Sequence, residues 1–209
     1  MKTVFFDIDT QLDFLYPAGA LYVPGAERIV PAIARLNRHA AQRGIPVIST
    51  ADAHLEDDVE FKTWPRHCVA GTIGQHKADS TLLEKRVVIP NRAFIRRPGG
   101  RPGFCDLAIE NAQQIVVEKQ TVDAFAAPNL SRILDRLAAD RYVVYGVVTE
   151  ICVLHAARGL LKTGKPVAVV TDAIEGLKAE DSKRALEEIR AAGGALIAVG
   201  QAILPAAAF

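Results

Sequence analysis

Short apolar runs alternate along the chain with longer stretches in which apolar residues recur at helical spacing. The runs are rich in Val and Ile and apolar on both faces, as expected of parallel strands buried within a sheet. They lie at 3–8, 45–50, 114–119, 141–148, 166–173 and 195–200. Amphipathic patterns between them predict helices at about 26–44, 127–140, 151–163 and 180–192. This alternation predicts an α/β fold, a three-layer αβα sandwich with a mostly parallel, doubly wound sheet.

The length of 209 residues suits one domain with a large core, and no shift in composition divides the chain. We therefore predict a single domain over 1–209. The middle of the chain, at about 55–113, departs from the alternation. There the Gly, Pro and Arg residues of "FIRRPGGRPGF" predict an irregular loop insertion around 90–108, which is a candidate lid over a binding site.

Charge and hydropathy narrow the class of partner. The formal net charge of +1 comes with no basic stripe or acidic tail, which argues against nucleic acid and membrane surfaces and favours a small-molecule substrate. The N-terminus carries no secretory signal and no apolar run is long enough to span a membrane, so we expect a cytoplasmic protein. The apolar-rich chain and its extended middle loop are compatible with a homo-oligomer.

Polar residues follow several of the predicted strands. Asp9 follows the first strand, and Asp52 and His54 follow the second. Lys119 ends the strand at 114–119, and Cys152 comes shortly after the strand at 141–148. The carboxyl ends of parallel strands meet at one edge of a sheet, where α/β folds bind their ligands. We therefore expect these side chains to lie close together.

Cys152 falls in the first turn of a helix that is predicted to begin at about Glu150, with Thr149 as its N-cap. The helix dipole and the unpaired N–H groups there would lower the pKa of a thiol and could hold an oxyanion. Position alone leaves open whether Cys152 is a nucleophile or a small buried hydrophobe. Lys119 is either a buried cation that needs an anion or a surface lysine. With Asp9, the two could act as nucleophile, charge-balancing cation and proton carrier.

A second cluster supplies oxygen and imidazole ligands. Asp52 and His54 stand at Asp-x-His spacing after a strand, a pair that by itself mostly marks a turn. His67 follows Trp64 in a stiff segment, which makes a metal site the better interpretation, and Glu60 is a candidate fourth ligand. This mixture of ligands suits Zn(II), with Mn(II) or Fe(II) as alternatives.

The motifs of the chain are "DTQLDF" at 9–14, "DAH" at 52–54, "WPRHCVAGTIG" at 64–74, "EKQTVDAF" at 118–125 and "GVVTEICVLHAA" at 146–157. Together they resemble the nicotinamidase branch of the isochorismatase-like cysteine hydrolases. The similarity covers about 1–200, and this set of motifs in this order is highly specific. Two features depart from the family: Glu150 replaces the more usual aspartate, and the segment 88–107 has no counterpart.

The resemblance implies a catalytic triad of Asp9, Lys119 and Cys152. It also implies a cis peptide bond between Val147 and Val148, with the backbone N–H groups of Val148 and Cys152 as an oxyanion hole. The implied reaction is the hydrolysis of nicotinamide to nicotinate and ammonia through a thioester, a step of NAD salvage.

The resemblance further implies the residues of the metal and substrate sites. A divalent metal, Zn(II) first, would be bound by Asp52, His54, His67 and, as in some members of the family, Glu60. Phe14 and Trp64 match positions that flank a pyridine ring.

Three other interpretations stay open from the sequence. A related carbamoyl- or ureido-amide hydrolase would share the triad and often lack the metal. A haloacid dehalogenase-type phosphatase would use Asp7 as nucleophile and Asp9 as acid/base, although Gln11 stands where those enzymes usually place threonine. A non-enzymatic binding protein would require the triad to be incidental.

Overall fold

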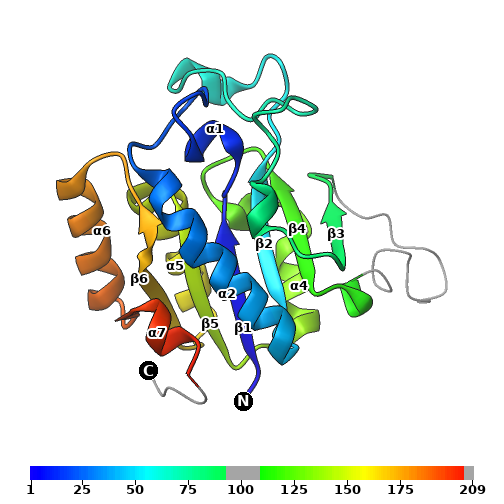
Figure 1. Cartoon of the computed structure of the whole chain (residues 1–209), viewed down its shortest axis with the longest axis vertical. Helices are drawn as coiled ribbons and strands as arrows, with labels where there is room; N and C mark the ends of the chain where they lie inside the picture. The colour runs from blue at the N-terminus through cyan, green and yellow to red at the C-terminus, as the bar shows by residue number, and fades with distance from the viewer. Residues whose placement is uncertain (93–108, 205–209) are drawn as a thin grey trace.

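The structure, a computed structural model, describes residues 1–92 and 109–204. One sheet of seven strands has the order β3-β4-β2-β1-β5-β6-β7, and every pair of neighbouring strands is parallel (Figure 1). The strands are β1 Thr3–Ile8, β2 Val47–Asp52, β3 Arg86–Ile89, β4 Gln114–Lys119, β5 Arg141–Val147, β6 Val167–Glu175 and β7 Ala195–Ile197. Apart from 90–92, the loop insertion predicted around 90–108 lies outside the described residues.

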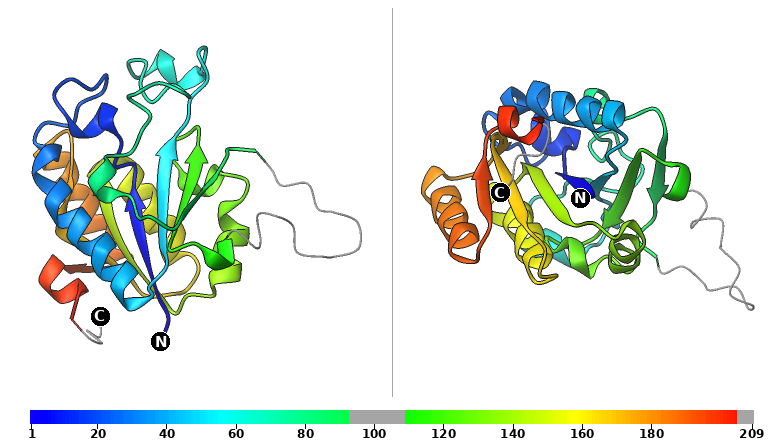
Figure 2. Two further views of the ribbon diagram at one scale, coloured as in Figure 1. Left: turned by 45° about the vertical axis from the view of Figure 1, so that its right-hand side comes forward. Right: turned by 90° about the horizontal axis from the view of Figure 1, so that it is seen from below.

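Helices cover both faces of the sheet. In Figure 2, α2 and α7 lie on one face, whereas α4, α5 and α6 lie on the other. The α-helices are α1 Leu12–Leu15, α2 Val30–Arg43, α4 Leu130–Leu137, α5 Leu154–Leu161, α6 Ala179–Ala191 and α7 Val199–Ala202. Single turns add η1 Ala26–Ile29, η2 Val59–Lys62, η3 Asp79–Thr81, η4 Ala124–Ala126 and the π-helix η5 Thr149–Val153. The predicted three-layer α/β fold is confirmed.

The strand predictions are correct apart from slightly shifted ends, but the pattern missed β3. This strand lies at the edge of the sheet, and Arg86 and Val88 are exposed while Ile89 is buried. The strand has only four residues and lies in the middle of the chain that departs from the alternation, so its short apolar run at 87–89 was not recognised as a strand. The helix over 151–163 also starts differently, because Val148 and not Thr149 is the N-cap of the π-helix that precedes α5.

The centre of the sheet brings β1 and β5 close together just before they end. Gly146 has a φ of +121°, which favours glycine, and a Cβ atom built there would lie 2.1 Å from the backbone oxygen of Ile8. Glycine therefore permits the close approach of β5 to β1. After Gly146 the chain continues directly into the turn that carries Cys152.

The carboxyl ends of the central strands form the edge where the polar residues gather. Asp52 and Lys119 are paired in the register of β2 and β4, and Asp9 directly follows β1. The chain passes from β1 to β2 on one side, whereas β5 lies on the other side of β1. This is the reversal of strand order at which doubly wound sheets bind ligands. Within the described ranges, no helix combines the length and the apolar character that a membrane span requires.

Candidate active site

The three residues predicted as a triad lie together at the carboxyl ends of β1, β4 and β5. Lys119 Nζ is 2.9 Å from Asp9 Oδ2 and 3.8 Å from Cys152 Sγ, and it also donates a hydrogen bond to Asp52. Asp9 is 0%, Lys119 1% and Cys152 5% exposed, so the group is withdrawn from water. The alternative of a surface lysine at position 119 is wrong.

One cation, Lys119, lies between two carboxylates, Asp9 and Asp52. Burial alone would lower the pKa of Lys119, but the nearby charges of Asp52 and Asp9 outweigh it and hold this pKa well above its usual value. Burial raises the pKa of Asp9, and the positive charge of Lys119 only partly offsets that rise. Lys119 therefore remains protonated, while Asp9 becomes a stronger base than an exposed carboxylate.

Cys152 does not carry the lowered pKa that its place at a helix start predicts. Burial raises the pKa of the Cys152 thiol well above its ordinary value, and the charge of Lys119 offsets this only in part. The negative charges of Asp9 and Asp52 add to the rise. The resting thiol is thus protonated, and it needs a base in contact with it before it can act as a nucleophile.

Thr50 on β2 holds the carboxylate of Asp9 in place, a role that the sequence did not reveal. Its Oγ1 donates to Asp9 Oδ1 at 2.6 Å and accepts from the backbone N–H of Asp9 at 3.2 Å. Asp9 has a φ of +47°, an uncommon value for a residue other than glycine. The only signal in the sequence is that Thr50 precedes Asp52 by two residues, so that both side chains point to the same face of the strand.

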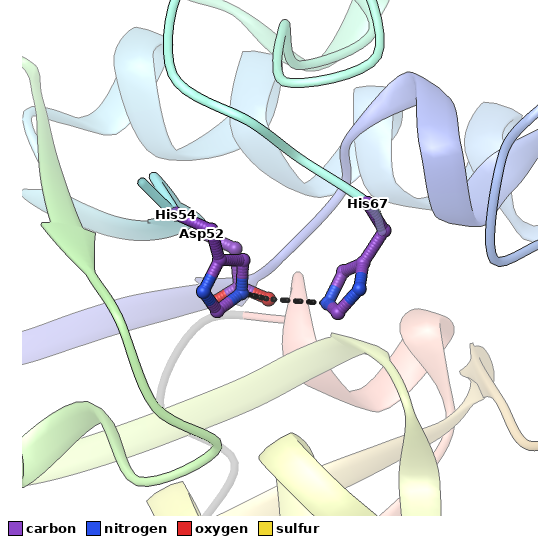
Figure 3. Close-up of side chains that lie close together, drawn as sticks. All are labelled: Asp52, His54 and His67. Carbon is purple, nitrogen blue, oxygen red and sulfur yellow. Dashed lines mark ion pairs between the residues drawn. The ribbon is translucent and has the colours of Figure 1, made fainter. Parts of the chain in front are cut away.

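The predicted metal ligands Asp52, His54 and His67 converge beside the triad (Figure 3). One ligand atom from each lies within 4.8 Å of the others. The Nε2 atoms of His54 and His67 are 3.8 and 3.9 Å from Asp52 Oδ2. His67 comes from a separate loop, and a dashed line in Figure 3 joins its ring to Asp52.

The hydrogen bonds of the two imidazoles involve their Nδ1 atoms and leave the Nε2 atoms, which lie nearer Asp52, available to a metal. His67 Nδ1 is 2.7 Å from the carbonyl oxygen of Pro65, and His54 Nδ1 is 3.0 Å from Asp58 Oδ2. A carbonyl or carboxylate oxygen only accepts, so each Nδ1 carries a proton, and the Nε2 of the neutral ring keeps its lone pair for a metal. Among the described residues, His54 Nε2 is buried without a hydrogen-bond partner. The donor set therefore fits a divalent cation.

Asp52 and Glu60 differ in their suitability as ligands. Burial would raise the pKa of Asp52, but Lys119 and His54 outweigh it and lower this pKa, so Asp52 is ionised. Glu60 is half-buried in η2 and groups with His54 and Asp58 rather than with the trio of Figure 3. Burial and the charge of Asp52 raise the pKa of Glu60. The geometry thus places Glu60 beside the trio.

A pocket opens onto the nucleophile. It is lined by Phe14, Leu21, Asp52, Glu60, Trp64, His67, Val122, Val148, Ile151, Cys152 and Leu177. The predicted ring-flanking residues Phe14 and Trp64 are both among them. The additional apolar walls were missed because they come from loops and turns without a pattern of their own. Among the described residues of this lining, the acidic side chains are Asp52 and Glu60, and neither lysine nor arginine is present.

Val148 and Cys152 both lie on the wall of this pocket. The peptide bond between Val147 and Val148 is cis, as the resemblance implied. Val148 is the N-cap of η5, and Cys152 lies within that turn. The first N–H groups of a helix have no partner inside the helix, so they are available to an anion.

Asp7, the nucleophile that a phosphatase would need, lies inside β1 and is 0% exposed. Its carboxylate accepts from Thr10 Oγ1 at 2.9 Å and from Ser49 Oγ at 3.0 Å, and Lys77 Nζ is 3.5 Å away. These partners saturate Asp7 within the core. Such burial is incompatible with attack on a phosphate ester.

Comparisons with known proteins agree with this geometry. A family profile described as Isochorismatase domain matches residues 3–201. Nicotinamidase/pyrazinamidase of Mycobacterium tuberculosis is 28% identical over 200 residues, which cover 91% of this chain and 95% of that protein. Pyrazinamidase of Pyrococcus horikoshii in complex with zinc superposes with a TM-score of 0.75 at 28% identity, covering 95% of this chain and 99% of that one.

N-carbamoylsarcosine amidase from Thermoplasma acidophilum has a TM-score of 0.73 at 25% identity, over 95% of this chain and 97% of that one. The fold alone therefore does not separate the amide substrates of these relatives. The family profile, however, spans almost the entire sequence. This chain belongs to the isochorismatase family.

Proposed function

We propose that this amide hydrolase is a nicotinamidase, which converts nicotinamide to nicotinate and ammonia. The observation that carries the proposal is the contact of Lys119 with both Asp9 and Cys152, because Cys152 lines a largely apolar pocket to which Asp52 and His67 also belong. The names of the relatives from M. tuberculosis and P. horikoshii support a carboxamide on an aromatic ring as the substrate.

The first half of the proposed reaction forms a thioester. Asp9 takes the proton of Cys152, and the sulfur attacks the amide carbon. The backbone N–H groups of Val148 and Cys152 donate to the oxyanion, and the positive charge of Lys119 stabilises the thiolate. Asp9 then protonates the departing ammonia.

The second half releases the acid. Asp9, once more a carboxylate, takes a proton from a water molecule that attacks the thioester carbon. The tetrahedral intermediate collapses, the carbon–sulfur bond breaks, and Cys152 recovers its proton. The raised pKa of Asp9 suits this exchange, because a carboxyl group must both gain and lose the proton during each turnover.

Asp52, His54 and His67 would hold the divalent metal, with Glu60 as a candidate fourth ligand. Zn(II) is the first candidate, in line with the P. horikoshii complex, and Mn(II) or Fe(II) would suit the same ligands. When bound, the metal supplies a Lewis-acidic position that can anchor a ring nitrogen. Asp52 also accepts from Lys119, so it links the metal ligands to the triad.

The charge of the pocket favours nicotinamide over the substrate of the carbamoyl-amide hydrolases. N-carbamoylsarcosine carries a carboxylate, which requires a cation or several donors in its binding site. Among the described residues that line the pocket, none is a lysine or arginine, whereas Asp52 and Glu60 are acidic. Apart from a bound metal, the described lining therefore offers no cation to a substrate carboxylate, and a neutral ring matches these side chains better.

Ammonia release from a panel of amides tests the proposal. We expect nicotinamide and pyrazinamide to be hydrolysed and N-carbamoylsarcosine to be spared. Cys152→Ala should abolish turnover and leave the circular dichroism spectrum unchanged, and a chelator should raise KM strongly. Residual turnover by Cys152→Ala above the buffer rate would refute the mechanism, and preference for N-carbamoylsarcosine would refute the substrate.

Cytoplasmic location and assembly into a homo-oligomer remain predictions. Sedimentation equilibrium of the purified protein measures its state of assembly directly. A mass near 22.5 kDa at all concentrations would exclude the oligomer.

A further inference from the structure

Glu150, which departs from the usual aspartate of the cysteine motif, reaches across to a different part of the chain. Its Oε1 accepts from the backbone N–H groups of Leu177 and Lys178, each at 2.9 Å. Its Oε2 accepts from Ser182 Oγ, also at 2.9 Å. One side chain, two residues before Cys152, is therefore bonded to the start of α6 at three points.

The segment that Glu150 holds forms part of the substrate pocket. Leu177 lines the pocket together with Cys152 and Ile151, although it lies on the connection between β6 and α6. The path of this connection determines whether the Leu177 side chain packs against the pocket. The hydrogen bond from the Leu177 N–H to Glu150 sets this position relative to the turn that carries the nucleophile.

Gly176 shows how closely the two segments approach. A Cβ atom at this position would lie 2.2 Å from Glu150 Oε2 and 2.0 Å from Ser182 Oγ. A larger residue would displace the carboxylate and break its bond to Ser182. The glycine beside Leu177 thus leaves the space that the longer side chain of glutamate occupies.

We propose that Glu150 is a specificity-determining positioning residue, which fixes Leu177 as a wall of the substrate pocket at a set distance from Cys152. This inference rests on the proposed hydrolysis of an aromatic carboxamide. Glu150 itself does not line the pocket, so it acts on the substrate through Leu177. Loss of the wall should weaken binding of the ring without slowing the chemistry at Cys152.

The three hydrogen bonds of Glu150 depend on the length of its side chain rather than on its charge. Aspartate keeps the charge but is shorter by one carbon–carbon bond of about 1.5 Å, which exceeds what a hydrogen bond tolerates. Glutamine loses the charge but keeps the length. Its Oε1 can accept both backbone N–H groups, and its Nε2 can donate to the hydroxyl of Ser182.

The test compares Glu150→Gln, Glu150→Asp and Glu150→Ala in the full chain, with nicotinamide as substrate. We expect KM to rise about tenfold for the aspartate and alanine variants, with kcat within about twofold, because the lost contact serves substrate and transition state alike. Glu150→Gln should retain the KM of the unmodified protein. Leu177→Ala should reproduce the raised KM, and Glu180→Ala, an exposed glutamate on the first turn of α6, is the matched control.

A second readout follows binding without turnover. Trp64 is the only tryptophan of the chain and lines the same pocket, so its fluorescence reports a bound ring. In the Cys152→Ala background, titration with nicotinamide should give a Kd that rises for Glu150→Asp and stays constant for Glu150→Gln. This pair retains a polar side chain and carries the comparison if Glu150→Ala fails to fold.

The outcomes separate this inference from the proposed function. Unchanged KM and Kd in Glu150→Asp, or a fall in kcat alone, would overturn the role of Glu150 while leaving the nicotinamidase proposal intact. Equal damage from Glu150→Gln and Glu150→Asp would show that the length of the side chain is not sufficient to hold Leu177, and would also overturn it. An unmodified protein that neither hydrolyses nor binds any ring carboxamide would refute the proposed function itself.

Discussion

Asp9 is oriented by a residue on the neighbouring strand. Thr50 donates to one carboxylate oxygen of Asp9 and accepts from its backbone N–H, which leaves the other oxygen facing Lys119. The Asp9 carboxylate is buried, so free rotation would cost it the hydrogen bond without compensation from water. Thr50 thus serves the proposed proton transfer although it does not line the pocket.

We predict that Thr50→Val lowers kcat about tenfold or more, because an unoriented base transfers protons less efficiently. Thr50→Ser keeps the hydroxyl and should retain most of the activity. Steady-state kinetics measure the effect, and thermal melting of both variants controls for folding. Equal kcat in the valine and serine variants would show that the hydroxyl has no part in catalysis.

At the scale of the elements, the loop between β2 and β3 carries His54, Glu60, Trp64 and His67 to the site, and Lys77 anchors its far end to the sheet. Lys77 is 5% exposed; its Nζ lies 3.5 Å from Asp7 Oδ2 and donates to the backbone oxygen of Thr50 at 3.0 Å. The sequence pattern predicted the ligands of this loop but not its anchor, because nothing near Lys77 in the chain marks it as buried.

Lys77→Met should destabilise the fold by about 3–5 kcal/mol, since it leaves Asp7 as a buried charge without its cation. Denaturant unfolding measures the change, and Lys85→Met on an exposed lysine is the control. The double variant Asp7→Asn/Lys77→Met removes both charges and should recover part of the loss. No recovery in the double variant would show that the pair contributes little and that Lys77 acts through Thr50 instead.

At the scale of the whole molecule, the metal ligands come from the end of β2 and from a loop that folds back over the sheet. A cation bound to Asp52, His54 and His67 would therefore join these two segments. A ligand that binds only the folded chain stabilises it by mass action, by about 2.7 kcal/mol at a concentration of 100 times Kd.

We predict that Zn(II) raises the Tm of the metal-free protein and that a chelator reverses the rise. His54→Ala removes a ligand whose Nε2 is buried and free, so its Tm should respond far less to Zn(II). Differential scanning calorimetry with a metal assay of the same samples measures both. An identical response in His54→Ala would place the metal elsewhere on the protein.

The amino-acid sequence predicts the order of the elements and the parallel sheet. It also predicts the edge of the sheet at which four residues meet, namely Asp9, Asp52, Lys119 and Cys152. These features follow from local periodicity and from the rule that parallel strands end at a common edge. The resemblance to a family then supplied roles for the same residues, and the structure brings these residues together. The edge strand β3 was missed because its apolar run is short and lies in the irregular middle of the chain.

Tertiary structure alone settled the features that depend on residues distant in the chain. The raised pKa of Cys152 reverses the expectation from its helix, because burial and two carboxylates outweigh one cation and a short turn. Thr50 meets Asp9 through the pairing of β1 with β2, and Glu150 meets Leu177 through the packing of α6 against η5. Such contacts depend on three-dimensional proximity across elements, which no local pattern of hydrophobic and polar residues encodes.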